Sequence, residues 1–360
     1  MKKILSLITI FVVAFFMVGC KKKAANKLYI LNVGDYMDDS LVQAFEKKYN
    51  CDVVYTEKSS NEEIYYTLQH DKYDICVISD YMVDRMRQEG SLEEIDFSKI
   101  PNYKTSELFP DALNLLNTQC KDYSPYMVPY FWGSVGILYN TSVSGLQEYV
   151  HEKGLLAVFE SNSYRVGMYD SARDALCLCA LAHGESNINT ADEAVLRVAS
   201  QKLKSCQYPV WGDDDLKSKV HSGEIDMALV YSGDYLDELY QIGESGEEEN
   251  IDYYAPESTN VWIDGLAILK NAENKEMAYA FIDFINSLEN AAQNADFIGY
   301  CPLSKEVKDL LFKSEDEGGY GYDYDDEHFY PFASGRQMYK YVSNEHYDLL
   351  NVLLEEAKSK

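Results

Sequence analysis

Residues 259–269 read TNVWIDGLAIL, and the organisation of the chain is decided around this stretch. A Trp, an Asp and a Gly lead into an apolar run that is typical of a buried strand. Because residues two apart in a strand point to the same face, Trp262 and Asp264 would present an aromatic plane and a carboxylate to one space. Such a pair suits an organic cation. A core Trp beside a turn Asp is the alternative interpretation of these residues alone.

The first twenty residues form a targeting segment rather than part of the fold. Two lysines precede an apolar stretch that ends in MVGC at residues 17–20. This pattern predicts a lipoprotein signal peptide over 1–20, with Cys20 as the lipidated residue, and a short basic tether over 21–26. An uncleaved membrane anchor is the alternative. Either interpretation places the mature chain outside a bacterial membrane, on its outer face or in a periplasm.

Composition limits the partners. The chain has 360 residues, enough for two lobes of ordinary domain size, and a formal net charge of −28. Nucleic acid is therefore excluded as an expected partner, because its phosphate backbone requires a basic surface. An acidic surface raises the local concentration of a cationic ligand, although it also serves solubility alone. We expect a monomer.

The chain lacks the common signatures of catalysis and metal binding. No G-x-S-x-G, P-loop or G-x-G-x-x-G motif is present. The histidines show no H-x-x-x-H spacing and the cysteines no C-x-x-C spacing, so we predict no metal site and no cofactor. One disulfide among the seven cysteines other than Cys20 stays open. We expect a binding protein and not an enzyme.

The segment after the tether alternates between strand and helix patterns, which predicts a largely parallel sheet flanked by helices. Strands are expected over 28–33, 52–55 and 73–79, and helices over 38–49, 61–69 and 81–89. Ligands bind at the carboxyl ends of such strands, which are residues 33–36 and 79–81 here.

A long apolar and aromatic run, VPYFWGSVGILYN at 128–140, predicts a strand that crosses between two lobes. A second α/β unit follows from about residue 146, and residues 259–269 would cross back. The strands of this second unit are expected over 165–170 and 225–231, and its helices over 171–183 and 191–203. Exposed loops are expected over 243–250, which is acidic, and over 315–327. Later helices are expected over 275–288 and 338–357.

These segments, taken in order, resemble the extracytoplasmic substrate-binding proteins of spermidine/putrescine importers. The resemblance runs through nearly the whole mature chain, and is carried by residues 28–50, 73–96, 128–140, 169–176 (YDSARDAL), 229–235 (LVYSGDY), 261–285 and 298–304 (IGYCPLS). It implies the two-lobed type II periplasmic-binding-protein fold, with two α/β lobes and mixed sheets joined by crossing strands. Lobe 1 would comprise 27–135 and 264–303, and lobe 2 would comprise 136–263 and 304–360.

The resemblance also implies the ligand site. A polyamine needs carboxylates for its ammonium groups and flat apolar faces for its methylenes, because an unpaired buried charge is very costly. Asp264 and Trp262 match the family's central carboxylate and stacking Trp, and Asp174 matches an acidic position after the shared Ala-Arg pair. The remaining matched positions are Tyr36, Ser79, Tyr81, Tyr231, Tyr300 and the acid Asp35 of the N-W-G-E/D-Y motif.

Asp170 and Asp174 are informative without the family. They flank the first turn of a predicted helix, whose N-terminal end is electropositive and would repel an ammonium group. Two carboxylates there could reverse that sign. Capping of the helix by Asp170 or Ser171 is the alternative and requires no ligand.

Three departures from the family pattern bear on the ligand. Val33 and Tyr231 stand where relatives usually have Trp, and Ser171 stands where an acid is frequent. Two aromatic faces are thus smaller or lost. We expect retained amine binding with altered selectivity, and the longer polyamine is the less favoured ligand.

The expected function is capture of putrescine or spermidine for the permease of an ABC importer. The main competing hypothesis is the same fold with another ligand, such as a different cation, an amino acid or a metal ion. The adjacent tyrosine pairs 65–66 and 253–254 would suit iron only if they lay in the cleft. Two different functional classes also stay open, a surface enzyme such as a lipid-anchored hydrolase and a surface adhesion or sensing module.

Overall fold

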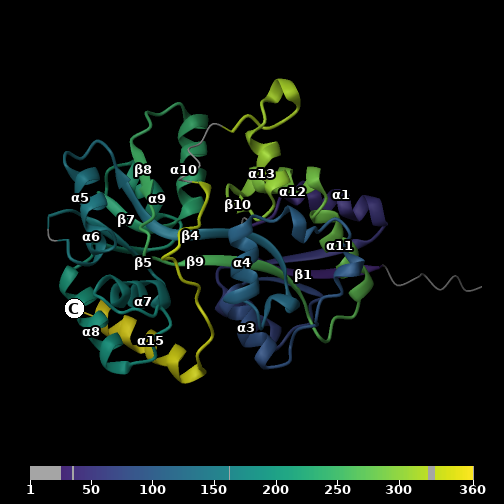
Figure 1. Cartoon of the computed structure of the whole chain (residues 1–360), viewed down its shortest axis with the longest axis horizontal. Helices are drawn as coiled ribbons and strands as arrows, with labels where there is room; N and C mark the ends of the chain where they lie inside the picture. The colour runs from purple at the N-terminus through teal and green to yellow at the C-terminus, as the bar shows by residue number, and fades with distance from the viewer. Residues whose placement is uncertain (1–25, 35, 162, 323–328, 360) are drawn as a thin grey trace, which may run out of the picture.

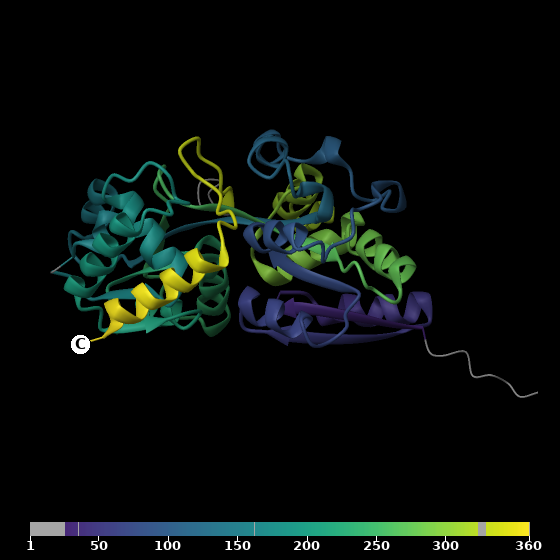
Figure 2. The same ribbon diagram turned by 90° about the horizontal axis from the view of Figure 1, so that it is seen from below.

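The computed structural model describes residues 26–34, 36–161, 163–322 and 329–359. Figure 1 shows two α/β lobes side by side, with strands β4 (Val128–Asn140) and β9 (Val261–Ile268) running between them. Figure 2 shows the same two lobes from below. Among the described residues, no helix is both long and apolar enough to cross a membrane.

The first lobe is built on three parallel strands, β1 (Lys27–Val33), β2 (Asp52–Lys58) and β3 (Ile75–Ser79), with β1 in the middle. This arrangement confirms the predicted parallel pairing. Strand β9 pairs antiparallel with β3 and makes the sheet mixed. The helical elements of this lobe are α1 (Asp39–Tyr49), α2 (Asn61–Leu68), α3 (Asp80–Gln88), η1 (Phe97–Lys99), η2 (Thr105–Glu107), α4 (Pro110–Thr118), η3 (Ser124–Tyr126), α11 (Lys275–Ile285) and α12 (Leu288–Ile298).

Local sequence explains where helix α1 begins and ends. The Asp38 carboxylate accepts a hydrogen bond from the backbone N–H of Ser40 and so caps the helix. Leu41 and Phe45 on one stripe are buried, and the Phe45 ring packs on Phe281 of α11. Asn50 takes the left-handed conformation, with φ of 49°, and stops the helix.

The second lobe continues the same sheet. The first part of β4 pairs with β9, and residues 135–139 pair antiparallel with β7 (Met227–Tyr231). Strand β5 (Val166–Tyr169) lies parallel to both β7 and β6 (Val210–Gly212), so the sheet runs β2-β1-β3-β9-β4-β7-β5-β6. The remaining elements here are β8 (Ile251–Tyr254), which pairs with β4, and helices α5 (Leu146–Lys153), α6 (Leu156–Phe159), α7 (Ala172–Ala182), α8 (Glu193–Cys206), α9 (Leu216–His221), α10 (Ser232–Ser245) and α15 (Asn344–Lys358).

Several expected boundaries are wrong, and two of them have a clear physical reason. The last helix begins at Asn344, not at Met338, because the backbone N–H groups of Met338 and Lys340 donate to Gln119 and Asn189 instead of forming helical bonds. Ser343 then caps the helix. Helix α10 extends into the first residues of the acidic loop expected over 243–250 and ends at Ser245, since Ile242 is buried on its inner face.

We propose that the chain returns to the second lobe later than residue 304, the boundary expected from the sequence. Strand β10 (Cys301–Pro302) pairs with β4, and α13 (Lys305–Phe312) packs against α12 and β10 of the first lobe. The turn η4 (Glu315–Glu317) follows, and Tyr330 still contacts Trp132. Helix α15 packs on α7 and α8 of the second lobe. We therefore propose a crossing near residues 331–340.

Candidate ligand-binding site

A cavity of about 1470 Å³ lies between the two lobes. Each predicted ligand residue that the structure describes lines it: Tyr36, Ser79, Tyr81, Asp170, Asp174, Tyr231, Trp262, Asp264 and Tyr300. Asp35 and the lipidation candidate Cys20 lie outside the described residues. The fold thus brings together positions from both ends of the chain.

Asp264 is the acid that the first lobe contributes. It lies on β9 directly opposite Ser79 on β3, so both side chains point to the same face of the sheet. The Tyr36 hydroxyl donates to its Oδ2 at 2.9 Å, while its Oδ1 is buried with no hydrogen-bond partner among the described residues. Burial raises the pKa of Asp264 to about 6, although the Ser79 and Tyr36 hydroxyls oppose the shift. This carboxylate is poorly solvated, and a cation would supply the hydrogen-bond donor that its Oδ1 lacks.

Asp80 is a second buried acid behind Asp264, and sequence reasoning missed it. Its Oδ1 accepts from the backbone N–H of Tyr81 at 2.6 Å, and its Oδ2 accepts from that of Ile263 at 3.3 Å. Burial, and then the charge of Asp264, raise the pKa of Asp80 well above its usual range. Its position directly after a buried strand was the available signal.

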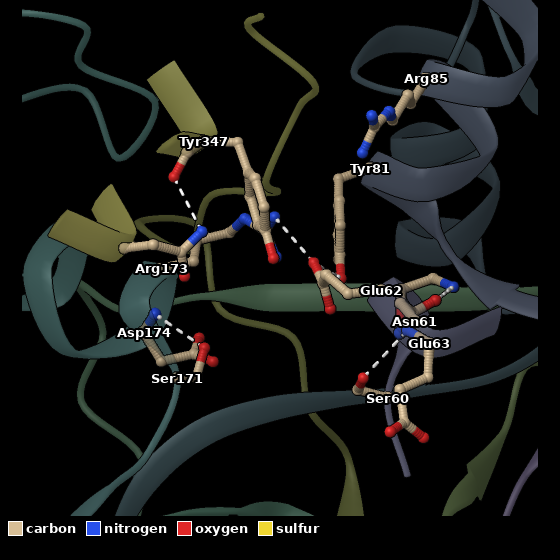
Figure 3. A network of polar contacts seen from close by, with 12 residues as sticks. Ser60, Asn61, Glu62, Glu63, Tyr81, Arg85, Ser171, Arg173, Asp174 and Tyr347 are labelled. Atoms are coloured by element: carbon tan, nitrogen blue, oxygen red, sulfur yellow. Dashed lines mark hydrogen bonds and ion pairs between the residues drawn. The ribbon is translucent and has the colours of Figure 1, made fainter. Parts of the chain in front are cut away.

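Asp174 is a buried acid that the second lobe contributes, and Asp234 on α10 is another. Asp174 lies in the first turn of α7, where the Ser171 hydroxyl accepts from its backbone N–H at 3.3 Å and caps the helix (Figure 3). This confirms that Ser171 or Asp170 caps α7. The Tyr231 hydroxyl donates to Oδ2 of Asp174 at 2.8 Å, and Oδ1 is buried without a described partner. Both lobes therefore use the same arrangement, a tyrosine on one carboxylate oxygen and an open second oxygen.

Aromatic rings form the wall between the two acids. The ring centroids of Trp262 and Tyr300 are 5.2 Å apart at 70°, and Tyr36 meets Tyr300 at 5.9 Å and 83°. Tyr231 stands edge-on to Trp262 at 6.2 Å. These rings offer flat faces and partial negative charge to a chain of methylenes between cationic ends.

Three more of the predicted residues have protein partners. The Ser79 hydroxyl accepts from Asn61 at 3.0 Å, and both oxygens of Asp170 accept from the Lys358 ammonium at 2.8 Å. One ring face of Tyr81 is covered by the Arg173 guanidinium at 3.4 Å. Asp170 and Tyr81 are thus less open to a ligand than Asp174 and Asp264.

The geometry defines a class of protein: two lobes that enclose a cavity equipped with carboxylates and rings. The family model for bacterial extracellular solute-binding proteins matches residues 40–318, and the chain belongs to this family. It is 31% identical over 301 residues to the spermidine/putrescine-binding periplasmic protein of Escherichia coli K12, covering 79% of this chain and 80% of that protein. It is 28% identical to the spermidine/putrescine-binding periplasmic protein 1 of Haemophilus influenzae, covering 87% of this chain and 88% of that one.

A solved structure described as a putative spermidine/putrescine ABC transporter from Listeria monocytogenes superposes with a TM-score of 0.77. It is 29% identical and covers 93% of this chain and 99% of its own. The predicted two-lobed, type II periplasmic-binding-protein fold is therefore confirmed. Members of this family are extracytoplasmic binding components.

Proposed function

We propose that this chain captures a polyamine between its lobes and delivers it to the permease of an ABC importer. The observation that carries the proposal is the pair of open, buried carboxylate oxygens, on Asp264 and Asp174, at the ends of an aromatic wall. An ammonium group placed at each oxygen replaces a costly unpaired acceptor with a charge-assisted hydrogen bond. The names of the relatives point to the same ligand class.

The ligand would act by bridging. Because one acid belongs to each lobe, a diamine or polyamine contacts both only when the lobes are closed, and so it favours the closed form. Trp262, Tyr300, Tyr36 and Tyr231 would then cover its methylenes. We further propose that Cys20 carries the lipid that holds the protein at the outer face of the cell membrane.

The experiment is thermal unfolding of residues 21–360 with putrescine, cadaverine, spermidine, spermine and a set of amino acids. A ligand at 100 times its dissociation constant adds about 2.7 kcal/mol to the free energy of unfolding. We expect a shift of several degrees with at least one amine. Asp264→Asn removes the charge that holds the ammonium and should abolish the shift.

Asp226→Asn is the matched control, because Asp226 pairs with Arg165 away from the cavity. It should lower stability but keep the amine shift. A shift with amino acids and with no amine would overturn the proposed ligand class.

A further inference from the structure

The proposed function leaves a buried polar network around Tyr36 unexplained. Asn294 is 1% exposed and is one of the buried residues of α12, together with Ala292, Ala295 and Ile298. Asparagine is a poor helix former, and burying its amide is costly unless both polar atoms find partners. A buried asparagine among apolar residues therefore indicates a specific polar contact.

The hydrogen bonds of this network can run in one direction only. The backbone N–H of Asp38 can only donate, and it donates to Oδ1 of Asn294 at 3.0 Å. Nδ2 of Asn294 therefore faces the Tyr130 hydroxyl of β4 and donates to it at 2.6 Å. The hydroxyl hydrogen of Tyr130 is then directed at the backbone carbonyl of Tyr36, which can only accept, at 2.8 Å. Asn294 thus fixes the direction in which the Tyr130 hydroxyl points.

The Tyr36 carbonyl is also held from a second side. Nδ2 of Asn32 on β1 donates to it at 3.1 Å. These contacts matter because Tyr36 lies after the end of β1 and before the start of α1, outside both elements. Its position is therefore set by side chains from β1, β4 and α12 rather than by a strand or a helix.

The position of Tyr36 in turn affects Asp264. The Tyr36 hydroxyl donates to Oδ2 of Asp264 at 2.9 Å and lowers the pKa of this carboxyl, against the rise that burial causes. A shift of the Tyr36 backbone by about 1 Å would take the hydroxyl out of hydrogen-bond range. The other titratable groups near Asp264 are Asp80, Tyr130 and Tyr300. Burial raises the pKa of both tyrosines well above the usual range, so each stays neutral.

We propose that Asn294 and Tyr130 are positioning residues of the ligand site, which hold the Tyr36 backbone where its hydroxyl supports the ionised form of Asp264. Neither is among the described residues that line the cavity. This inference rests on the proposed function and deepens it. Asn294 orients the Tyr130 hydroxyl, Tyr130 holds the Tyr36 carbonyl, and Tyr36 keeps Asp264 ready to pair with an ammonium group.

The experiment is an NMR titration of ligand-free residues 21–360, labelled with carbon-13 at the aspartate carboxyl, with Asp264→Asn to assign the signal. Tyr130→Phe keeps the ring that packs on Tyr36 and removes only the hydroxyl. Asn294→Leu keeps the approximate shape of the side chain without its polar atoms. Each should raise the pKa of Asp264 from about 6 by about one unit, the scale of one hydrogen bond to a charged group. By linkage, putrescine affinity should then fall about fivefold at pH 6 and by less than about twofold at pH 8.

Asn290→Leu is the matched control. Asn290 lies one turn earlier on α12 and donates instead to the carbonyl of Phe284, at 2.8 Å. Its loss should lower the unfolding midpoint and leave the pKa of Asp264 unchanged. Tyr36→Phe should raise that pKa by itself, and adding Asn294→Leu should raise it no further, because Asn294 acts through Tyr36.

Lower unfolding midpoints with an unchanged Asp264 pKa in Tyr130→Phe and Asn294→Leu would show that the network only stabilises the lobe, and the inference would be wrong. A further rise in the double variant would also overturn it. If Asn294→Leu does not fold, Tyr130→Phe carries the same test. A raised pKa in the variants, with no amine bound by wild type, would remove the proposed function and leave the positioning of Tyr36 standing.

Discussion

At the scale of single residues, the cavity favours a cation because the Asp264 carboxylate is buried, where its negative charge is poorly solvated. Asp264 accepts from Tyr36 and lies next to buried Asp80, and burial raises its pKa to about 6. An arriving ammonium stabilises the charged form, because the ion pair replaces the lost hydration. In the protein without ligand, the buried charge of Asp264 therefore costs free energy, and binding of an ammonium group reduces that cost.

The affinity for an amine should accordingly depend on pH. Above about pH 7, Asp264 is largely ionised and its contribution to the affinity should be constant. Below pH 6, binding must release the Asp264 proton, so affinity should fall by about tenfold per pH unit, the limit for one linked proton. Titration calorimetry at pH 5 to 8, in two buffers of different ionisation enthalpy, measures the affinity and counts the protons.

Asp170→Asn should show the same profile, since Asp170 is paired with Lys358. A flat affinity from pH 5 to 8 would contradict the assignment. The sign reverses for stability without ligand. Because the folded state holds the Asp264 proton more tightly than the unfolded state, Asp264 should make folding more favourable as pH falls from about 6 towards 3.8, relative to Asp264→Asn.

At the scale of elements, the register between β4 and β9 determines where the Trp262 ring of the aromatic wall lies. Gly133 on β4 pairs with Trp262 on β9. A Cβ at Gly133 would lie 2.3 Å from Cζ2 of the indole, so the absence of a side chain on β4 allows the Trp262 ring to lie across that strand. The wall thus depends on two strands, not on Trp262 alone.

Gly133→Ala should displace the Trp262 ring. Overpacking of this kind costs about 1–3 kcal/mol of stability. We expect a lower unfolding midpoint, altered tryptophan fluorescence and weaker amine binding. Gly243→Ala is the control, because nothing lies within 4 Å of the added Cβ and Ala favours its helix. An unchanged midpoint and affinity in Gly133→Ala would show that the ring does not require the glycine.

The sequence predicted the strands better than it predicted the side-chain contacts of the cavity. Alternating strand and helix patterns located β1 to β3, and apolar runs located both crossing strands, because each of these signals is local in the sequence. The partners inside the cavity could not be found that way. Tyr36 and Asp264 are 228 residues apart, and the Arg173 side chain leaves its own lobe for Glu62. Helix α15 begins later than predicted because of similar long-range contacts: side chains distant in the sequence accept hydrogen bonds from the backbone N–H groups of Met338 and Lys340.

The whole molecule is in a closed arrangement, because contacts cross the cavity from lobe to lobe. Arg173 meets Glu62, Arg85 meets Asn344, and the Tyr300 ring of the first lobe packs on Gly233 of α10 in the second. A Cβ at Gly233 would lie 2.2 Å from Cζ of Tyr300. Closure therefore requires a residue without a side chain at that point.

Gly233→Ala should hold the lobes apart without disturbing either lobe. The clash exists only in the closed form, and Ala is a better helix former than Gly, so the unfolding midpoint without ligand should stay or rise. Amine affinity should fall by about tenfold or more, since Asp174 can no longer reach a ligand bound to Asp264. Small-angle X-ray scattering should show a smaller radius of gyration for wild type with putrescine than without it, and no such change in the variant. Gly243→Ala, on the same helix but away from Tyr300, should close as wild type does. If Gly233→Ala also contracts with ligand, closure does not pass through this contact and Tyr300 is only a wall of the cavity.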